Sequence, residues 1–297
     1  MDKNVISRRD FLIKSSLVTA GLFTTGSLYH CTKPVKGMRM GLVTYLWGQD
    51  WDLPTLVANC ELTGYLGVEL RTQHAHGVEP TLSKNERIEI KKRFQDSPVE
   101  CVGYGSNQEF HAPDPQVLQE NIEGTFELIK LCHDIGASGV KVKPNRLPAE
   151  VAPEKTIEQI GRSLNEVGKF ATDYGQRIRV EVHGRETQKL QVMKAIFDHV
   201  TEPNVGICWN SNDEDLLPPG LEANFNLVKD RLADTVHIRE LNVGDYPYQK
   251  LFALLLAMNY SGWVLLEART SPHDRIAALK EQLMLFNDMI ARSKDQV

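Results

Sequence analysis

Short β-rich runs alternate with longer amphipathic stretches from residue 39 onward. Eight runs rich in Val, Ile, Leu and aromatic residues are expected to be strands: Arg39–Trp47, Leu66–Gln73, Val99–Tyr104, Gly139–Pro144, Ile178–His183, Val205–Trp209, Thr235–Leu241 and Gly262–Ala268. Helical periodicity marks stretches between them, among them Leu53–Leu62, Lys84–Phe94, Val117–Ile135, Ile157–Tyr174 and Gln188–His199. The strands recur about every 27–40 residues, which is the length of a βα unit.

Eight such units with no linker between them predict one (β/α)8 barrel over residues 32–297. Local signals agree, since Ser83-Lys84-Asn85-Glu86 has the spacing of a capping box and Gly136 suits a helix C-terminus. A doubly wound open sheet is the alternative. That architecture usually carries a glycine-rich phosphate loop, and the chain has neither GxGxxG nor GxxxxGK[ST].

The first thirty-one residues predict an export signal. Consecutive arginines stand in Ser7-Arg8-Arg9-Asp10-Phe11-Leu12, ahead of an apolar run from Ser15 to Leu28. This arrangement resembles the twin-arginine signal of bacteria, which implies a periplasmic protein exported in its folded state, often with a metal already inserted. Cys31 stands where a lipoprotein carries its lipid, although His30 is bulky where a small residue is usual. Lipid attachment at Cys31 is therefore an alternative to simple cleavage.

Composition excludes several classes of protein. Hydrophobic residues make up 41% and charged residues 25%, as in a folded globular chain. The net charge of −5 becomes −7 without residues 1–31, and no cluster of Lys and Arg offers a footprint for nucleic acid. Five cysteines without a CxxC pair argue against a disulfide scaffold or a zinc–thiolate site. Beyond the signal, contact with a membrane is expected only through lipid at Cys31.

Polar residues gather at the C-terminal ends of the predicted strands. In the fifth strand, a period of two places Glu181 and His183 on one face and Val180 and Val182 on the other. Charged side chains buried in a barrel need partners, water or an ion. The C-terminal mouth of a barrel provides them, and barrel enzymes keep their active sites there.

One polar residue from each of strands five to eight could contribute to a metal site. These residues are Glu181, Asn210, His237 and Glu267. Their mixed oxygen and nitrogen donors suit one divalent ion, Mn²⁺, Mg²⁺, Co²⁺, Ni²⁺ or Zn²⁺, with positions left open for substrate oxygens. Because thiolates are absent from the set, it is not a structural zinc site.

Other polar residues at the strand ends are candidates for contact with a substrate. They are His74, His76, Lys143, Asn212 and Arg239. Lys141 lies on the same strand face as Lys143, which is nearer the strand end and is the better candidate. Glu109 and His111, after strand three, could also reach the substrate. For the loop residues among these, an ordinary hydrogen bond within the loop is an equal alternative.

The last four strands carry a family resemblance. Their motifs VEVHG, VGICWNSN, VHIRE and LLEAR resemble the xylose-isomerase-like barrel family of sugar isomerases and epimerases, over roughly residues 39–290. The family also contains inosose dehydratases and apurinic endonucleases. The resemblance implies that Glu181, His237 and Glu267 are metal ligands, that the two glutamates also transfer protons, and that His183 touches substrate oxygens.

The strand-six motif departs from the family pattern. Asn210 stands where the family usually places Asp, and Asn212 where a His is common. An amide still offers a carbonyl oxygen, but it removes one negative charge from around the ion. Metal affinity is expected to fall, and the ion would keep more Lewis acidity toward a substrate.

These features predict an enzyme that removes a proton α to the carbonyl of a small, unphosphorylated sugar, with Glu181, Glu267 and His183 as catalytic residues. Return of the proton gives epimerisation or isomerisation, whereas loss of the β substituent, for example from a 3-keto-glycoside, makes the protein a lyase or dehydratase. A partner sugar dehydrogenase would supply the keto group.

Two further alternatives belong to other classes. A non-catalytic barrel that binds sugar or metal stays open because of Asn210, whereas the charge of −7 disfavours a repair endonuclease. Barrels of this kind often form homo-oligomers, and the sequence leaves the number of subunits open.

Overall fold

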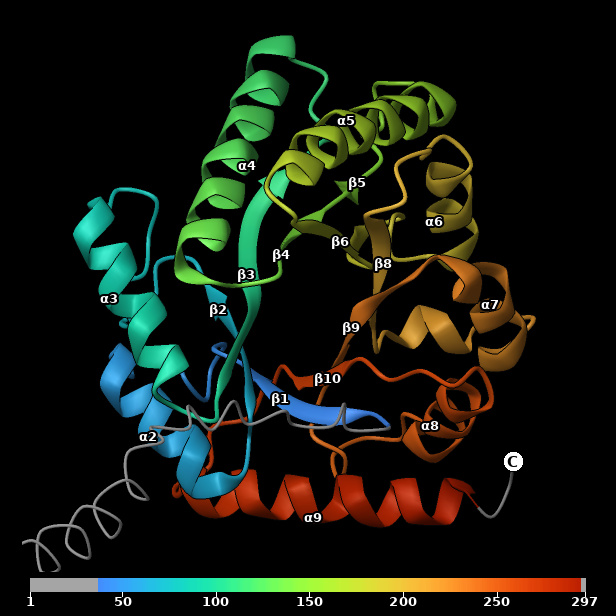
Figure 1. The fold of residues 1–297 in the computed structure, drawn as a ribbon. Helices are drawn as coiled ribbons and strands as arrows, with labels where there is room; N and C mark the ends of the chain where they lie inside the picture. The colour runs from blue at the N-terminus through green and yellow to red at the C-terminus, as the bar shows by residue number, and fades with distance from the viewer. Residues whose placement is uncertain (1–36, 295–297) are drawn as a thin grey trace, which may run out of the picture. The chain divides into compact units, whose positions relative to one another are not determined.

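The computed structural model describes residues 37–294, and these form a closed barrel of eight strands surrounded by helices (Figure 1). Neighbouring strands are parallel, and their order around the barrel is β1-β10-β9-β8-β6-β4-β3-β2. The predicted (β/α)8 architecture is confirmed. The expected signal at residues 1–31, with Cys31, lies outside the described residues.

The barrel strands overlap all eight predicted runs. They are β1 (Arg39–Val43), β2 (Gly67–Arg71), β3 (Glu100–Glu109), β4 (Gly139–Lys143), β6 (Arg177–Glu181), β8 (Val205–Asn210), β9 (Leu232–Ile238) and β10 (Trp263–Leu266). The boundaries differ most in β3, which continues to Glu109, and in β9, which begins and ends three residues early. A separate pair, β5 (Asn145–Arg146) and β7 (Gly184–Arg185), lies beyond the ends of β4 and β6 and was not expected.

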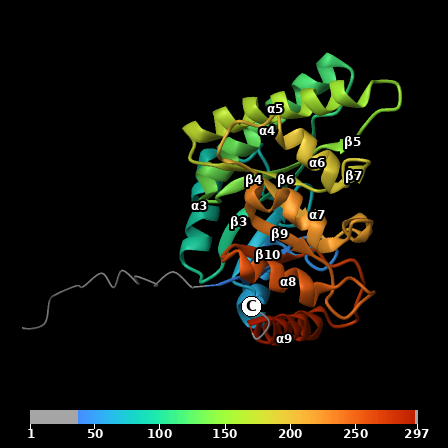
Figure 2. The same cartoon turned by 90° about the vertical axis from the view of Figure 1, so that its right-hand side faces the viewer.

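Helices pack around the strands, as two perpendicular views show (Figures 1 and 2). They are α2 (Leu53–Thr63), α3 (Lys84–Gln95), α4 (Pro115–Ile135), α5 (Pro153–Asp173), α6 (Leu190–Phe197), α7 (Leu221–Val228), α8 (Tyr248–Ala257) and α9 (Arg275–Lys294), with short 3₁₀ turns at Asp213–Leu216 and Lys229–Arg231. The capping box at Ser83 and the left-handed Gly136 are confirmed. Within residues 37–294, every helix is too short or too polar to cross a bilayer.

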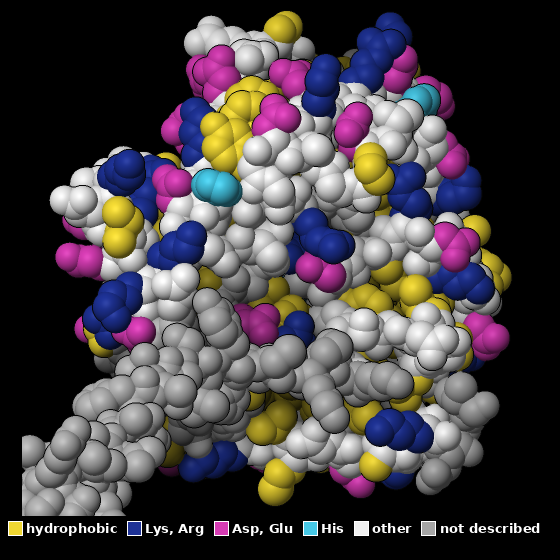
Figure 3. All heavy atoms as spheres, in the orientation of Figure 1, with side chains coloured by type: hydrophobic (Ala, Val, Ile, Leu, Met, Phe, Trp, Pro, Cys, Tyr) yellow, Lys and Arg dark blue, Asp and Glu magenta, His cyan; other side chains and the backbone are white. Residues whose placement is uncertain are grey.

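Two apolar regions hold the barrel together. The larger lies between the strands and the surrounding helices and includes Cys60, Cys101 and Cys132. These three and Cys208 are buried free thiols. The smaller lies inside the barrel and contains Val43, Val102, Trp263 and Leu265. On the outer surface, Figure 3 shows Lys and Arg side chains interspersed with Asp and Glu over the face in view.

Arg179 on β6 is a fully buried charge inside the barrel. Its guanidinium donates to both carboxylate oxygens of Asp234 at 2.8 and 3.0 Å, to the carbonyl of Val102 at 2.9 Å and to Ser138 Oγ at 2.8 Å. A side chain at Gly103 would collide with it, since an added Cβ would lie 2.3 Å from Nη1. The arginine therefore ties β3, β9 and the residue directly before β4 to β6, the strand that ends at Glu181.

We expect Arg179→Met to lower the free energy of unfolding by about 3 kcal/mol, because one partner of a buried charge pair is removed and its acceptors lose their donor. Urea unfolding would measure the change. Arg162→Met is the control, since Arg162 lies on the surface of α5 beside Glu158 and should have little effect. Equal stability of Arg179→Met and the parent protein would contradict this role.

Candidate functional site

Three buried side chains converge at the C-terminal end of the barrel. Glu181 ends β6, His237 lies near the end of β9, and Glu267 directly follows β10. One ligand atom from each lies within 4.8 Å of the others, and all three residues are buried. The structure thus brings together three of the four metal-site candidates, and this trio could hold a metal ion.

Asn210, the fourth candidate, lies beside the trio. The register of β8 and β9 pairs Asn210 with His237. Its side-chain Nδ2 donates to Glu181 Oε1 at 3.2 Å. Rotation of the amide by 180° would present the carbonyl oxygen Oδ1 in place of the nitrogen, and an amide oxygen is a donor suited to a divalent ion.

Glu69, a residue that sequence reasoning missed, orients the histidine of the trio. His237 Nε2 lies 3.4 Å from the carboxylate of Glu69, a fully buried residue of β2. The other ring nitrogen, Nδ1, is buried, has no hydrogen-bond partner within residues 37–294, and lies 3.9 Å from Glu181 Oε1. A carboxylate at Nε2 favours the proton there, so Nδ1 is the ring nitrogen that would lose its proton to bind a metal ion, and it faces the two glutamates.

Lys141, rather than Lys143, reaches the trio. Its ammonium group is fully buried inside the barrel and contacts Glu181 Oε2. Burial alone would raise the pKa of Glu181, but Lys141 and His237 lower it below the usual value. The pKa of Glu267 is raised instead, first by burial and then by the negative charge of Glu181. Two neighbouring carboxyl groups therefore have pKa values shifted in opposite directions, and a cation between them would relieve their repulsion.

Lys143 lies at the rim of the mouth with a second cation, Arg71 of β2. Lys143 Nζ is 3.4 Å from Glu109 Oε1 and 3.5 Å from Asn107 Oδ1. Arg71 Nη2 donates to the same Asn107 oxygen at 3.3 Å, and Nη1 lies 3.8 Å from Glu267. The alternation in Glu69-Leu70-Arg71 was the signal in the sequence, because a period of two puts both charges on one face of β2.

His183 lies just beyond β6 and is held by Asn145. Its Nδ1 is 3.0 Å from Asn145 Oδ1, and Asn145 Nδ2 donates to Glu109 Oε1 at 2.6 Å. Asn145 adopts a left-handed conformation with φ of 65°, and Gly184 packs so closely on its carbonyl that an added Cβ would be 1.7 Å away. Because Asn145 occupies Nδ1, the ring can offer Nε2 to a substrate.

The remaining substrate candidates are placed differently. Both ring nitrogens of His76 bind backbone groups, the carbonyl of Arg71 at 2.7 Å and the N–H of Val78 at 3.0 Å, so His76 supports its own loop. Asn212 is likewise engaged, because its amide donates to the carbonyl of Val182 at 2.6 Å.

His74 and Arg239 each have a side-chain nitrogen atom without a hydrogen-bond partner among the described residues. His74 Nδ1 lies 3.1 Å from Thr44 Oγ1, and burial together with His76 lowers the pKa of His74 to about 4. Arg239 Nε is buried without a partner among the described residues.

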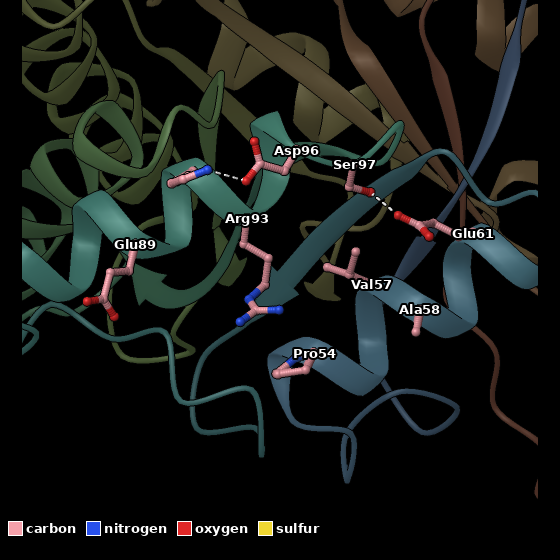
Figure 4. Close-up of a pocket in the computed structure, with 9 residues that line it drawn as sticks. Pro54, Val57, Ala58, Glu61, Glu89, Arg93, Asp96 and Ser97 are labelled. Atoms are coloured by element: carbon pink, nitrogen blue, oxygen red, sulfur yellow. Dashed lines mark hydrogen bonds and ion pairs between the residues drawn. The ribbon is translucent and has the colours of Figure 1, made fainter.

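A separate cavity of about 530 Å³ lies on the outside of the barrel, between α2 and α3 (Figure 4). Pro54 and Val57 line it on one side and Glu89 and Arg93 on the other, and none of the candidate site residues contributes to it. The chemistry at the barrel mouth is therefore separate from this cavity.

A closed (β/α)8 barrel with a Glu-His-Glu cluster at its C-terminal mouth defines this chain as an α/β-barrel protein with a candidate metal site. The model of the xylose isomerase-like TIM barrel family matches residues 57–289, so the chain belongs to that family.

Three solved structures share the fold. A 3-keto-D-glucoside 4-epimerase from E. coli is 14% identical, over 84% of this chain and 99% of that chain, with a TM-score of 0.71. A D-allulose 3-epimerase from Methylomonas sp. is 17% identical, over 86% of this chain and 98% of that chain, with a TM-score of 0.72. The IOLI protein with a bound zinc atom is 15% identical, over 86% of this chain and 99% of that chain, with a TM-score of 0.72.

A further buried carboxyl group supports the segment that follows β8. Asp215 accepts hydrogen bonds from Tyr246 Oη at 2.7 Å and from the backbone N–H of Asn212 at 3.0 Å. Tyr246 Oη in turn accepts one from Trp209 Nε1 at 3.2 Å. Burial raises the pKa of Asp215 from 3.8 to about 8. The folded protein therefore keeps a proton on Asp215 at pH values where the unfolded chain has released it.

We expect this proton to make the folded state less stable as pH rises between about 4 and 8, because over that range the native state binds one more proton at this site than the unfolded state. In Asp215→Asn the free energy of unfolding should no longer fall by this contribution, which is about 1.4 kcal/mol per pH unit. Urea unfolding of both proteins at several pH values would measure it. Parallel stability curves for the two would show that Asp215 is ionised in the folded protein.

Proposed function

We propose that this protein is a divalent-metal-dependent enzyme that removes a proton α to the carbonyl of an unphosphorylated keto-sugar and returns it as an epimerase or isomerase. The observation that carries the proposal is the buried cluster of Glu181, His237 and Glu267 at the mouth of a barrel of this family. The reaction class is supported by two epimerases of the same fold, the 3-keto-D-glucoside 4-epimerase and the D-allulose 3-epimerase.

The side chains fit a divalent ion. His237 presents a buried ring nitrogen without a partner among the described residues, and two buried carboxylates face it. Glu181, His237 and Glu267 would hold the ion, with Asn210 as a further ligand through its amide oxygen. A bound divalent ion would polarise the sugar carbonyl and acidify the neighbouring C–H bond. The zinc atom in the IOLI protein supports metal binding in this fold, and the donor set is compatible with Mn²⁺, Mg²⁺, Co²⁺, Ni²⁺ or Zn²⁺.

The chain itself supplies two carboxylates for proton transfer. Glu181 and Glu267 come from β6 and from the end of β10, which are separated in the barrel by β8 and β9. One can therefore accept the α proton while the other returns a proton at a different position. Lys141 holds Glu181 in place and compensates its charge. His183 is a third proton-transfer candidate through Nε2.

Elimination is the second candidate reaction, and the position of His183 favours it. Its Nδ1 donates to Asn145 Oδ1, so Nε2 carries a lone pair that can take up the α proton and then deliver that same proton to the departing β substituent. The same first step, removal of the α proton, then gives a lyase or dehydratase. A sugar dehydrogenase would supply the keto group in either reaction. We also propose, from the arginine pair in residues 1–31, that the reaction takes place in the periplasm.

Replacing Glu181 or Glu267 by Gln should lower the rate of exchange of the sugar's α proton by about 10²–10⁴-fold, because Gln cannot accept or return the proton. The measurement is proton NMR in D₂O on metal-loaded protein with a panel of keto-sugars and 3-keto-glycosides. Glu100→Gln is the control and should keep full activity, because Glu100 lies at the N-terminal end of β3, away from the site. Metal binding without exchange of any sugar proton by the parent protein would favour the non-catalytic alternative.

Replacing Glu69 by Gln should weaken binding of Mn²⁺ or Zn²⁺ by about 10–100-fold, because the amide no longer provides the carboxylate that holds the proton on His237 Nε2. Isothermal titration calorimetry with the two metal salts measures this without reference to turnover. Glu100→Gln again serves as the control. An unchanged affinity in Glu69→Gln would show that this carboxylate does not orient the histidine for metal binding.

A further inference from the structure

Two cations at the rim of the site share one neutral acceptor. Arg71 Nη2 and Lys143 Nζ lie 3.3 and 3.5 Å from the same oxygen, Asn107 Oδ1. Only 16% of the Arg71 side chain and 13% of the Lys143 side chain are exposed, so water screens their charges poorly. An amide oxygen carries no charge, so the charges at this corner, which we name the Arg71–Lys143 corner, are balanced among the described residues only by Glu267 at 3.8 Å from Arg71 and Glu109 at 3.4 Å from Lys143.

The nearby carboxylates already have other partners. Glu109, at 3.4 Å from Lys143, also accepts from Asn145 and lies 3.6 Å from His111. Glu267, at 3.8 Å from Arg71, belongs to the metal-site trio. Neither pairs with the guanidinium of Arg71 through two parallel hydrogen bonds, the geometry in which Arg binds a carboxylate most strongly.

Arg179, an arginine with a structural role in the same barrel, provides a comparison for the hydrogen bonds of Arg71. Its guanidinium donates to both oxygens of Asp234, to a carbonyl and to a hydroxyl. Arg71, by contrast, makes one hydrogen bond from its guanidinium to another side chain, and its buried Nε has no partner among residues 37–294. A guanidinium carries five N–H donors, so most of those on Arg71 have no hydrogen-bond acceptor in the part of the chain that the structure describes.

The unused guanidinium is also fixed in position. Gly105 on β3 leaves room for the stem of Arg71, since an added Cβ would lie 3.0 Å from its Cδ. The ring of Tyr45 lies on another side, with its centroid 5.6 Å from the guanidinium carbon. An arginine whose side chain is already fixed by packing loses little conformational entropy when its N–H groups bind a ligand.

We propose that the Arg71–Lys143 corner binds an anionic group of the substrate, a carboxylate or a phosphate, while the rest of the sugar lies toward Glu267. The proposal rests on the proposed function for the sugar and adds that the sugar is acidic. A carboxylate agrees with the unphosphorylated substrate proposed above, whereas a phosphate would replace that part of the proposed function. Burial and the charge of Lys141 lower the pKa of Lys143, and an anion at this corner would offset both effects. A bidentate pair with Arg71 is the geometry that either anion favours.

The test is isothermal titration calorimetry of the full chain, metal-loaded and at low ionic strength, with three probes that differ in charge: D-glucuronate, D-glucose 6-phosphate and D-glucose. We expect at least one acidic probe to bind on the order of tenfold or more tightly than glucose, and added salt to reduce the difference. The tighter of the two acidic probes identifies the anion as carboxylate or phosphate, and tighter binding of D-glucose 6-phosphate would count against an unphosphorylated substrate. Equal or undetectable binding of all three probes overturns the proposal.

Variants then locate the anion. Arg71→Gln and Lys143→Gln should each lower the affinity for the acidic probe by about tenfold and leave that for glucose unchanged. Lys130→Gln, on the outer face of α4, is the matched control and should change neither. An acidic probe that binds Arg71→Gln and Lys143→Gln as tightly as the parent protein overturns the assignment to this corner.

The outcomes separate this inference from the proposed function. Exchange of the α proton in neutral keto-sugars, without any preference for acidic probes, would leave the proposed function standing and overturn the anion site. Tight binding of an acidic probe that depends on Arg71 and Lys143, without proton exchange in any neutral or acidic keto-sugar, would support the anion site and count against the proposed reaction.

Discussion

Charge burial inside a closed parallel barrel is the constraint on which the rest of this structure depends. Closure turns every second side chain of each strand toward the barrel interior, where water is scarce. In this chain those positions include Glu69, Lys141, Arg179, Glu181 and His237, all nearly or fully buried. A charge in such a place is tolerated only with a partner. The pattern of partners therefore decides which side chains are structural and which are available for chemistry.

The number of partners that each buried charged side chain has differs along the barrel axis. Arg179 makes four hydrogen bonds, to Asp234, to the carbonyl of Val102 on β3 and to Ser138 before β4, so it has a structural role. Nearer the mouth, Lys141 compensates the charge of Glu181 and Glu69 lies beside Nε2 of His237, but Nδ1 of that histidine has no partner among the described residues. At the rim, most donors of Arg71 have no hydrogen-bond acceptor within residues 37–294. The share of side-chain polar atoms that have a partner thus decreases toward the mouth, where a ligand would supply the missing contacts.

The placement of candidate residues could be predicted from the sequence where one strand could be interpreted by itself. Glu181, His237 and Glu267 each stand near the C-terminal end of a β-rich run, and parallel strands bring such ends together. Prediction was less complete where a contact joins distant strands. Lys143 was preferred because it is nearer the strand end, yet Lys141 contacts Glu181. Glu69 was overlooked because its partner, His237, lies on the strand separated from β2 by β1 and β10.

The sequence alone determined the barrel, its eight strands and the end of the barrel at which polar side chains collect. These follow from local periodicity, which each segment carries by itself. Tertiary structure alone decided which polar side chains are already used. His76 and Asn212 are engaged by nearby backbone, whereas Nδ1 of His237 and Nε of Arg71 have no partner among residues 37–294. The reason is geometric, because the direction and remaining donors of a side chain depend on strand register and barrel closure.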